Sequence, residues 1–313
     1  MGEFDLIERI RRRIGDSDSV VLGIGDDAAV ITPTPGMALV ATTDALVLDR
    51  HFTDDWVPAD IGHLALHANL SDIAAMGAVP RWALLALTLP EDDPDWLEGF
   101  LDGFLGAAEH ASVVLVGGNI SSGPLNIAVE LLGEIAPDRI ATRHGAQPGD
   151  QLVVTGTLGD AAAALALGSE APEALIARLY RPQARVQAGR VLAETAHALI
   201  DISDGLLADL GHLLHDRLGA EVRIDELPAS AALQKAISDP ARRRCFQAGG
   251  GNDYELLAAL PPLPDGELEQ LARAAGVPLT VIGQVDASGQ VRCRDADGNE
   301  LADLAPGWDH FSP

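Results

Sequence analysis

Seven aspartates of the chain stand at the ends of apolar runs, next to glycine, serine or threonine. They are Asp26 and Asp27 in G-I-G-D-D-A, Asp44 in A-T-T-D-A-L, Asp72 in N-L-S-D-I, Asp201 and Asp204 in I-D-I-S-D-G-L, and Asp253 in G-G-G-N-D-Y. A carboxylate buried alone is costly, so acids in such positions need partners. The chain has 47 acidic residues and only 21 basic ones, which makes divalent metal ions the alternative partners. Mg²⁺ is typically held by a few carboxylates together with substrate phosphates.

Each of these acids also has a plain structural explanation. Asp44 could cap a turn after its strand, Asp72 could be a polar residue late in a helix, and Asp204 could be the N-cap of the helix that follows. Their shared setting at strand ends favours a multi-metal phosphate site. That interpretation requires the acids to meet in one pocket of the folded chain.

Glycine-rich segments suit the same chemistry. The segment 117–123, G-G-N-I-S-S-G, follows an apolar run and could present backbone N–H groups and hydroxyls to an anion. The segment 155–161, T-G-T-L-G-D-A, could do the same at the start of a helix, or could be an ordinary strand–helix turn. A Walker phosphate loop needs a lysine in G-x-x-x-x-G-K-[ST], and the one lysine, Lys235, lies in L-Q-K-A-I-S. Metal ions and arginines would therefore have to neutralise any bound phosphates.

The elements that would position these residues alternate between strands and helices, which predicts an α/β fold. We expect strands within 20–48 and at 82–89, 111–118, 125–135, 151–155, 198–202, 221–224, 254–260 and 279–285, and helices at 3–13, 58–76, 93–110, 159–168, 181–198 and 206–218. A turn-rich, polar stretch at 137–150 marks a domain boundary. With 313 residues the chain fits two domains, which we place at 1–138 and 139–313.

The composition limits the classes of partner. A formal net charge of −26 repels nucleic acid phosphates and anionic membranes, so neither is an expected partner. No apolar run reaches the roughly 18 residues of a transmembrane helix. The two cysteines, Cys245 and Cys293, match no zinc spacing and make no disulfide framework, which favours a cytoplasmic location with reduced thiols.

An ordered set of motifs spans essentially the whole chain and resembles the thiamine-monophosphate kinase family. The motifs are G-E-F-D-L-I, G-I-G-D-D-A-A-V, T-T-D, N-L-S-D-I-A-A-M-G-A-V-P, G-G-N-I-S-S-G-P-L, T-G-T-L-G-D-A-A, D-I-S-D-G-L, G-G-G-N-D-Y-E-L-L and G-W-D-H-F. The wider superfamily includes aminoimidazole ribonucleotide synthetase, selenophosphate synthetase and a hydrogenase maturation protein. G-I-G-D-D-A together with D-I-S-D-G-L favours the thiamine branch.

The resemblance implies a fold, an assembly and a reaction. It implies a two-domain α/β subunit whose N-terminal strands pair with those of a second copy into a shared β-barrel, giving a homodimer, and a C-terminal domain whose sheet is covered by helices. ATP would bind between the two domains. The reaction would convert thiamine monophosphate and ATP to thiamine diphosphate and ADP by direct in-line transfer, with several Mg²⁺ ions and no phosphoenzyme.

The resemblance also implies roles for individual residues. Metal ligands would be Asp27, Thr42, Thr43, Asp44, Asp72, Asp201 and Asp204, with Asp26 joining or orienting them. ATP contacts would be Gly118, Asn119, Arg143 and Ser203, and the thiamine phosphate would meet His51, Asn252 and Trp308. The residues implied to be catalytic are Asp27, Asp44, Asp72, Asp204 and Arg143, the last by stabilising charge.

Three positions depart from the family pattern. Asn119 stands where G-G-D is common, Asn252 stands where many members carry an acid, and Leu64 replaces a frequent lysine. Two other functions therefore stay open. One is a related ATP-dependent enzyme with a different substrate, and the other is a non-catalytic nucleotide- or metal-binding protein.

Overall fold

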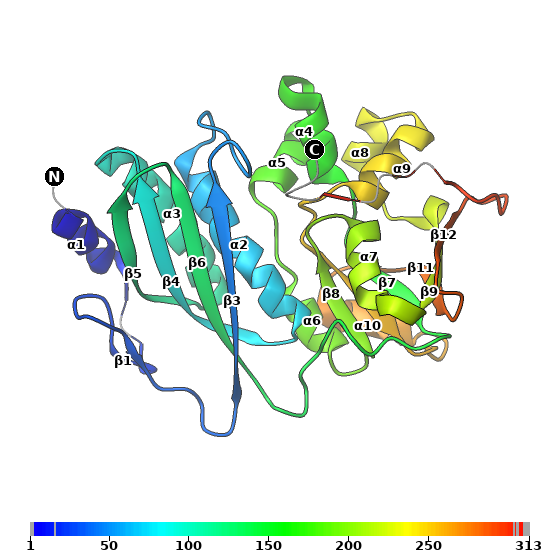
Figure 1. Ribbon diagram of the computed structural model, residues 1–313, viewed down its shortest axis with the longest axis horizontal. Coiled ribbons are helices and arrows are strands. Elements are labelled where there is room, and N and C mark those ends of the chain that lie inside the picture. Colours follow the sequence, from blue (N-terminus) through cyan, green and yellow to red (C-terminus); the bar gives the residue numbers. More distant parts are fainter. Residues whose placement is uncertain (1–2, 16, 303, 305–306, 309–313) are drawn as a thin grey trace. The chain divides into compact units, whose positions relative to one another are not determined.

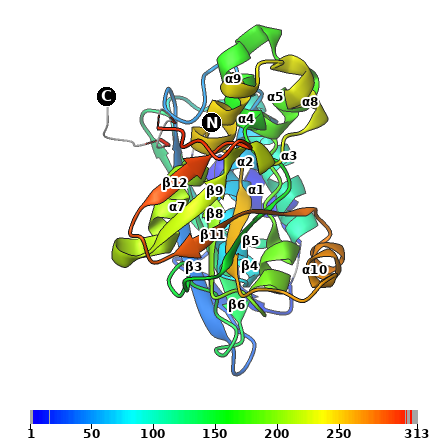
Figure 2. The same cartoon turned by 90° about the vertical axis from the view of Figure 1, so that its right-hand side faces the viewer.

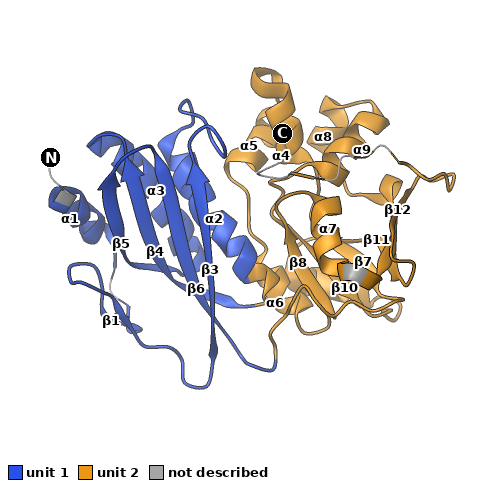
Figure 3. Cartoon of the chain, in the orientation of Figure 1, with its two compact units in different colours: residues 1–73, 78–138 blue, residues 74–77, 139–313 orange. Residues whose placement is uncertain are grey.

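The computed structural model describes residues 3–15, 17–302, 304 and 307–308. The chain divides into two compact units, which Figure 3 colours separately. Unit 1 comprises residues 1–73 and 78–138, and unit 2 comprises residues 74–77 and 139–313. In the described part of the chain, no helix is both long enough and apolar enough to cross a membrane.

Unit 1 is built on a four-stranded sheet in the order β3-β6-β4-β5, with β1 and β2 forming a separate two-stranded ribbon (Figure 1). The strands are β1 (Val20–Leu22), β2 (Val30–Ile31), β3 (Ala38–Val47), β4 (Val79–Leu89), β5 (Val114–Ser122) and β6 (Asn126–Ile135). The helices are α1 (Glu3–Arg13), α2 (Pro58–Ala75) and α3 (Pro94–Ala111). β6 pairs antiparallel with β3 and β4, whereas β5 runs parallel to β4.

Helices α2 and α3 cover one face of this sheet (Figure 1). Alternate strand residues such as Leu87 on β4 and Ile127 on β6 are buried on that face. Gly103 on α3 lets α2 and α3 pack closely. A Cβ at Gly103 would lie 1.7 Å from the Ala59 carbonyl oxygen, so a larger residue there would push α2 and α3 apart.

The opposite face of the sheet carries no helix in Figure 1. By strand alternation this open face bears Leu39 and Ala45 on β3, Leu84 on β4, and Ala128 and Leu132 on β6. Leu39 is 50% exposed, and Leu84 and Leu132 are partly exposed. The uncovered face of unit 1 is thus partly apolar, and it also bears Thr43 of β3 and Glu130 of β6.

Unit 2 is built on a six-stranded sheet in the order β12-β9-β11-β7-β10-β8, antiparallel except where β12 meets β9. The strands are β7 (Gln151–Thr155), β8 (Ala198–Ile202), β9 (Gly219–Arg223), β10 (Glu255–Leu260), β11 (Leu279–Asp286) and β12 (Val291–Arg294). The helices are α4 (Asp160–Leu167), α5 (Glu173–Tyr180), α6 (Val186–Leu192), α7 (Leu206–Leu214), α8 (Ala231–Ala236), α9 (Pro240–Gly249) and α10 (Glu267–Ala275).

Both faces of the unit 2 sheet are covered by helices, and successive residues of its central strands β8 and β10 are accordingly all buried. Leu152 and Leu257 face a core with α7, whereas Val153 and Leu256 face a second core with α6 and α10. Figure 2 shows α7 and α10 on opposite sides of the strands. The expected two-domain α/β architecture, with helices covering the C-terminal sheet, is therefore confirmed.

One expected helix was only partly right. The helix expected over 181–198 is limited to α6 (Val186–Leu192), and an irregular segment separates α6 from α5, which ends at Tyr180. Pro182 explains part of the difference, because proline disfavours helical geometry at the residue before it. Residues 117–122 of the glycine-rich segment continue β5 in register with β4, beyond the strand expected at 111–118.

Candidate active site

The unit 1 part of the candidate site centres on a contact between β3 and α2. The Thr42 hydroxyl donates a hydrogen bond to Oδ2 of Asp72. Burial raises the pKa of the Asp72 carboxyl, and the hydrogen bond from Thr42 opposes that shift. Asp72 is thus a partly desolvated carboxylate supported by a neutral hydroxyl.

Asn69 fixes the neighbouring part of β3. Its Oδ1 accepts a hydrogen bond from the Asp44 N–H at 3.1 Å, and its Nδ2 donates to the Ala65 carbonyl at 3.0 Å. Because β3 is an edge strand, this N–H is satisfied by a side chain of α2. Asn69 was not among the residues named from the sequence, although an amide in an otherwise apolar helical segment was a usable signal.

The pleat of β3 separates the threonines of T-T-D. Thr42 and Asp44 share the face that meets α2, whereas Thr43 faces the other side, opposite Glu130 of β6. The Thr43 side chain is therefore not brought together with Asp72.

The G-I-G-D-D segment lies in an exposed turn between β1 and β2. The Asp26 carboxylate accepts a hydrogen bond from the Asp27 N–H at 2.8 Å, and both acids are exposed. One of the two adjacent acids thus shapes the turn, which leaves the Asp27 side chain projecting from it.

His51 closes the turn that follows β3. Its Nδ1 accepts a hydrogen bond from the Val47 N–H at 2.9 Å. The neutral ring therefore carries its proton on Nε2, which makes Nε2 a donor.

Gly118 and Asn119 lie on β5, at the other edge of the sheet from β3. A Cβ on Gly118 would fall 1.9 Å from the Leu85 carbonyl oxygen, so close strand pairing alone requires glycine there. Asn119 is exposed and pairs with Ala86, which places it on the open face with Ala128 and Ala45. Within unit 1 these residues are three strand spacings, about 14 Å, from Asp44.

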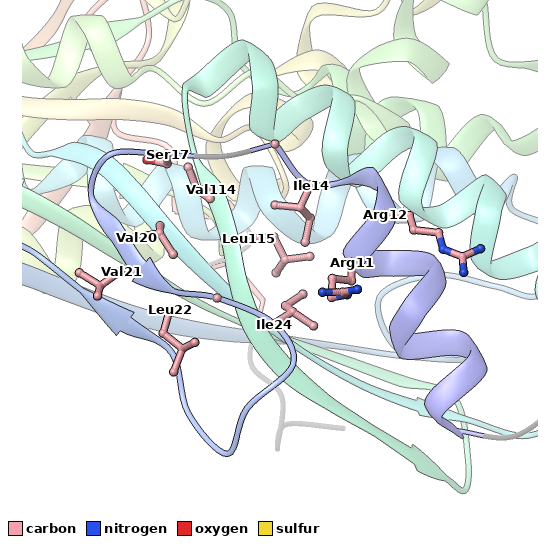
Figure 4. Close-up of a pocket in the computed structure, with 12 residues that line it drawn as sticks. Arg11, Arg12, Ile14, Ser17, Val20, Val21, Leu22, Ile24, Val114 and Leu115 are labelled. Atoms are coloured by element: carbon pink, nitrogen blue, oxygen red, sulfur yellow. The ribbon is translucent and has the colours of Figure 1, made fainter.

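A groove in unit 1 lies elsewhere, between α1, β1 and β5 (Figure 4). Its volume is about 550 Å³, and its lining includes Arg11, Ile14, Val20 and Leu115. Arg11 is paired with Glu8 at 2.8 Å. The residues that line the groove include none of the site residues named from the sequence.

The unit 2 part of the candidate site is the loop between β8 and α7. Ser203, Asp204 and Gly205 donate their backbone N–H groups to Oδ2 of Asp209, at 3.1, 3.2 and 3.1 Å. Burial and the nearby Asp204 charge raise the pKa of Asp209 to about 7, against the effect of the three hydrogen bonds. Asp209 was not among the residues named from the sequence, although it is an acid within the apolar stretch L-L-A-D-L-G-H-L-L.

Two other predicted residues are tied to the same loop. The Asn252 N–H donates to the Ser203 carbonyl at 2.8 Å, and the Trp308 N–H donates to the Asp204 carbonyl at 2.9 Å. The Trp308 side chain is 55% exposed. The structure therefore brings Ser203, Asp204, Asn252 and Trp308 together.

Asp201 and Arg143 are placed differently. Asp201, 9% exposed, points to the face of β8 that carries Leu199. Arg143 is exposed and follows Thr142, whose carbonyl accepts a hydrogen bond from the Leu199 N–H. Arg143 thus lies beside the start of β8, about 13 Å of strand from the Ser203 loop at its end.

A buried ionic network holds the segment that carries Asn252. Glu255 is fully buried. It accepts hydrogen bonds from Thr155 at 2.6 Å, from Arg178 at 2.8 Å, and from Nε and Nη2 of Arg185, each at 2.6 Å. Asp253 accepts the Gly159 N–H at 2.9 Å, and its burial raises its pKa well above the ordinary value. This acid, chosen as a metal-site candidate by its setting, serves the backbone instead.

The predicted metal ligands are divided between the units. Asp27, Thr42, Thr43, Asp44 and Asp72 belong to unit 1, and Asp201 and Asp204 belong to unit 2. Over the described ranges, no three His, Cys, Asp or Glu side chains lie together as a metal cluster. The donor chemistry nevertheless fits Mg²⁺, because carboxylate and hydroxyl oxygens dominate the set. In addition, the pKa of the partly buried Asp72 carboxyl is set by burial and by a neutral hydroxyl.

Profiles of two protein families match the chain. The AIR synthase related protein N-terminal domain matches residues 25–135, and the AIR synthase related protein C-terminal domain matches residues 147–296. Together they define the class of the chain as a two-domain AIR synthase-related protein.

Curated relatives narrow that class. The chain is 41% identical to the thiamine-monophosphate kinase of Escherichia coli (strain K12), covering 99% of this chain and 98% of the relative. It is 39% identical to that of Haemophilus influenzae, with the same two coverages. The chain belongs to the thiamine-monophosphate kinase family.

Solved structures agree. The thiamine-monophosphate kinase of Stenotrophomonas maltophilia K279a superimposes with a TM-score of 0.88 and 41% identity, over 96% of this chain and 98% of that one. A structure described as "AaThiL complexed with AMPPCP and TMP" gives a TM-score of 0.76 and 34% identity, over 99% and 97% of the two chains.

Proposed function

We propose that this protein transfers the γ-phosphoryl group of ATP to thiamine monophosphate, giving thiamine diphosphate and ADP. The observation that carries the proposal is full-length identity of about 40% to thiamine-monophosphate kinases. A structural relative with bound AMPPCP and TMP supports the same pair of substrates, a nucleoside triphosphate and a phosphorylated acceptor.

The roles of the acids follow from the charge of the substrates. Two anions must approach each other, and positioning with charge neutralisation dominates such a transfer. Asp27, Asp44, Asp72, Asp201 and Asp204 would hold Mg²⁺, with Thr42 orienting Asp72 and Thr43 contributing through its backbone. Bound Mg²⁺ supplies the neutralisation between the two phosphate groups.

Other residues would contact the substrates directly. Ser203, Gly118, Asn119 and the exposed Arg143 would bind ATP, with Arg143 countering charge on the transferred group. His51 would donate from Nε2 to the acceptor phosphate, which is consistent with the Val47 N–H occupying its Nδ1. Asn252 and the half-exposed Trp308 would bind the thiamine end.

The assembly would be a homodimer formed through unit 1. The open sheet face with Leu39, Leu84 and Leu132 is the surface that a shared β-barrel would bury. Asn119 lies on that face, so its ATP contact would fall near the subunit boundary. Unit 1 would thus be the ATP- and metal-binding dimerisation domain. The cytoplasmic location expected from the cysteine usage stays a prediction.

The decisive experiment measures product formation by the purified protein with ATP, Mg²⁺ and thiamine monophosphate. We expect thiamine diphosphate and ADP in equal amounts. ADP release only with a different acceptor would assign the chain to a related ATP-dependent enzyme. Binding of Mg²⁺ and AMPPCP without turnover would assign it to the non-catalytic class, for which Asn119 and Asn252 are the relevant departures.

A further inference from the structure

We propose that Asp209 is a positioning residue of the phosphoryl-transfer site, whose carboxylate holds the loop 203–205 so that the Asp204 side chain is presented for metal binding. The inference rests on the proposed function and deepens it. It assigns a role to a residue outside the motif residues that the resemblance implies.

The contact consists of several hydrogen bonds to a single carboxylate oxygen. One oxygen, Oδ2 of Asp209, accepts three consecutive backbone N–H groups, from Ser203, Asp204 and Gly205, all between 3.1 and 3.2 Å. Strand β8 ends at Ile202, so these amides leave the sheet at the point where the loop begins. Asp209 is 4% exposed, so water is a poor substitute as an acceptor.

Asp209 is itself held rigidly. It lies in the first turn of α7, and its own N–H donates to the Gly205 carbonyl at 3.0 Å. Leu206, Leu210 and Leu213 anchor the same helix in the core. Gly205, with φ +124°, offers no side-chain cap, and the amides that Asp209 binds precede Leu206, the first residue of α7.

The arrangement determines how the loop can act. Because Asp209 uses the amides of Ser203 and Asp204, a phosphate cannot use them, and these residues act through their side chains. The loop carbonyls are also committed, Ser203 to Asn252 and Asp204 to Trp308. Displacing the loop would therefore move Ser203 and Asp204 together with the segments of Asn252 and Trp308.

The competing explanation is that Asp209 only stabilises the start of α7. Such a cap would have to satisfy only the amides of α7 itself, whereas Asp209 binds those of Ser203 and Asp204, which precede Gly205, the N-cap of the helix. The two explanations differ in what happens to metal binding when Asp209 is changed, since a positioning residue alters the metal requirement and a cap alters only stability.

The test compares Asp209→Ala and Asp209→Asn with Asp150→Ala in the full-length protein. Asp150 is the control for a buried carboxylate outside the loop, because it is 2% exposed, accepts the Gln147 N–H at 2.8 Å and contacts His197 Nδ1 at 2.9 Å. The readouts are melting temperature, kcat, KM for ATP and the Mg²⁺ concentration that gives half-maximal rate. Mg²⁺-dependent binding of AMPPCP is measured in parallel.

We expect Asp209→Ala to lower kcat/KM and raise the half-maximal Mg²⁺ concentration, each by about 10- to 100-fold, the range for residues that support metal ligands. Asp209→Asn should recover much of both, because one oxygen makes all three hydrogen bonds. Asp150→Ala should lower the melting temperature with an unchanged Mg²⁺ requirement.

Unchanged Mg²⁺ dependence in a folded Asp209→Ala protein would overturn the proposal. If that variant does not fold, Asp209→Glu decides, because the longer side chain keeps the charge and displaces the oxygen; a wild-type Mg²⁺ requirement would then refute the role. Failure of the proposed function looks different, since the wild-type protein itself would form no thiamine diphosphate. AMPPCP binding would still test Asp209 in that case.

Discussion

The Thr42 hydroxyl on β3 donates a hydrogen bond to the Asp72 carboxylate on α2, across 30 positions of sequence. The contact joins two motifs, T-T-D and N-L-S-D, that were linked only by the family resemblance. It also explains why T-T-D begins with a threonine whose side chain faces the helix. Asn69, one turn before Asp72, fixes the Asp44 backbone from the same helix.

Replacing Asp72 with Asn should separate activity from stability. Burial disfavours the charged carboxylate, as its raised pKa shows, so a neutral amide should keep or raise the melting temperature. Loss of the metal-binding charge should lower kcat/KM at least about 100-fold. Steady-state kinetics and thermal unfolding at pH 7.5 measure both effects.

Thr42 provides the matched comparison for Asp72. Thr42→Ser keeps the donor and should retain most activity, whereas Thr42→Val keeps the shape and should lower kcat/KM about tenfold. An Asp72→Asn protein with near-wild-type turnover would remove Asp72 from the site.

Trp308 should matter for the acceptor and little for the fold. Its backbone N–H, which binds Asp204, survives any substitution, and its ring is 55% exposed. Trp308→Ala should therefore raise KM for thiamine monophosphate about tenfold, leave KM for ATP unchanged and leave the melting temperature within about 1 °C. Trp308→Phe should restore most of the affinity, since stacking needs an aromatic face. Equal changes in both KM values would argue against a thiamine contact.

The open face of the unit 1 sheet should form the dimer. Leu84→Arg would place a bulky charge in the middle of that face, beside Glu130 of β6, so we expect a monomer by light scattering at micromolar concentration, where we expect the wild-type protein to be a dimer. Leu165→Arg is the control, because Leu165 is 67% exposed on α4 and lies outside the face. A Leu84→Arg protein that stays dimeric would place the interface elsewhere.

Local patterns predicted the framework better than the connections. The strand at 198–202 and the helices at 3–13 and 58–75 follow from apolar spacing and from Pro58 at a helix start. Helix α9 was missed although Asp239 and Pro240 are a cap signal, and the Asp239 side chain does accept the Ala241 N–H. The signal was present, but the arginine-rich segment lacked a clear apolar stripe.

The site residues likewise divide into those that the motifs indicated and those that depend on contacts of the folded chain. Motif position indicated Ser203, Asp204, Asn252 and Trp308, which the fold brings together, but not Asp209, because its role depends on one side-chain oxygen reaching three amides. Strand pleat, equally invisible in the motif, turns Thr43 away from Asp44. Contacts of this kind arise only once register and rotamer are fixed.

Glu134 should make unit 1 lose stability in acid. The Glu134 side chain is 1% exposed, and burial alone would raise its pKa. The hydrogen bonds from the Thr34 N–H and hydroxyl and the ion pair with Arg81 outweigh burial. The pKa of Glu134 therefore lies below the ordinary value. A depressed folded-state pKa adds stability above the unfolded value, about 4.3, which is lost as pH falls through the folded pKa. The wild-type protein should therefore melt well above Glu134→Gln from pH 8 to about 5, and this difference should shrink below about pH 4.3. Glu109→Gln, which removes an exposed acid of α3, should show no such convergence. If the difference in melting temperature between the wild-type protein and Glu134→Gln widens on acidification, the folded protein instead favours the protonated form of Glu134.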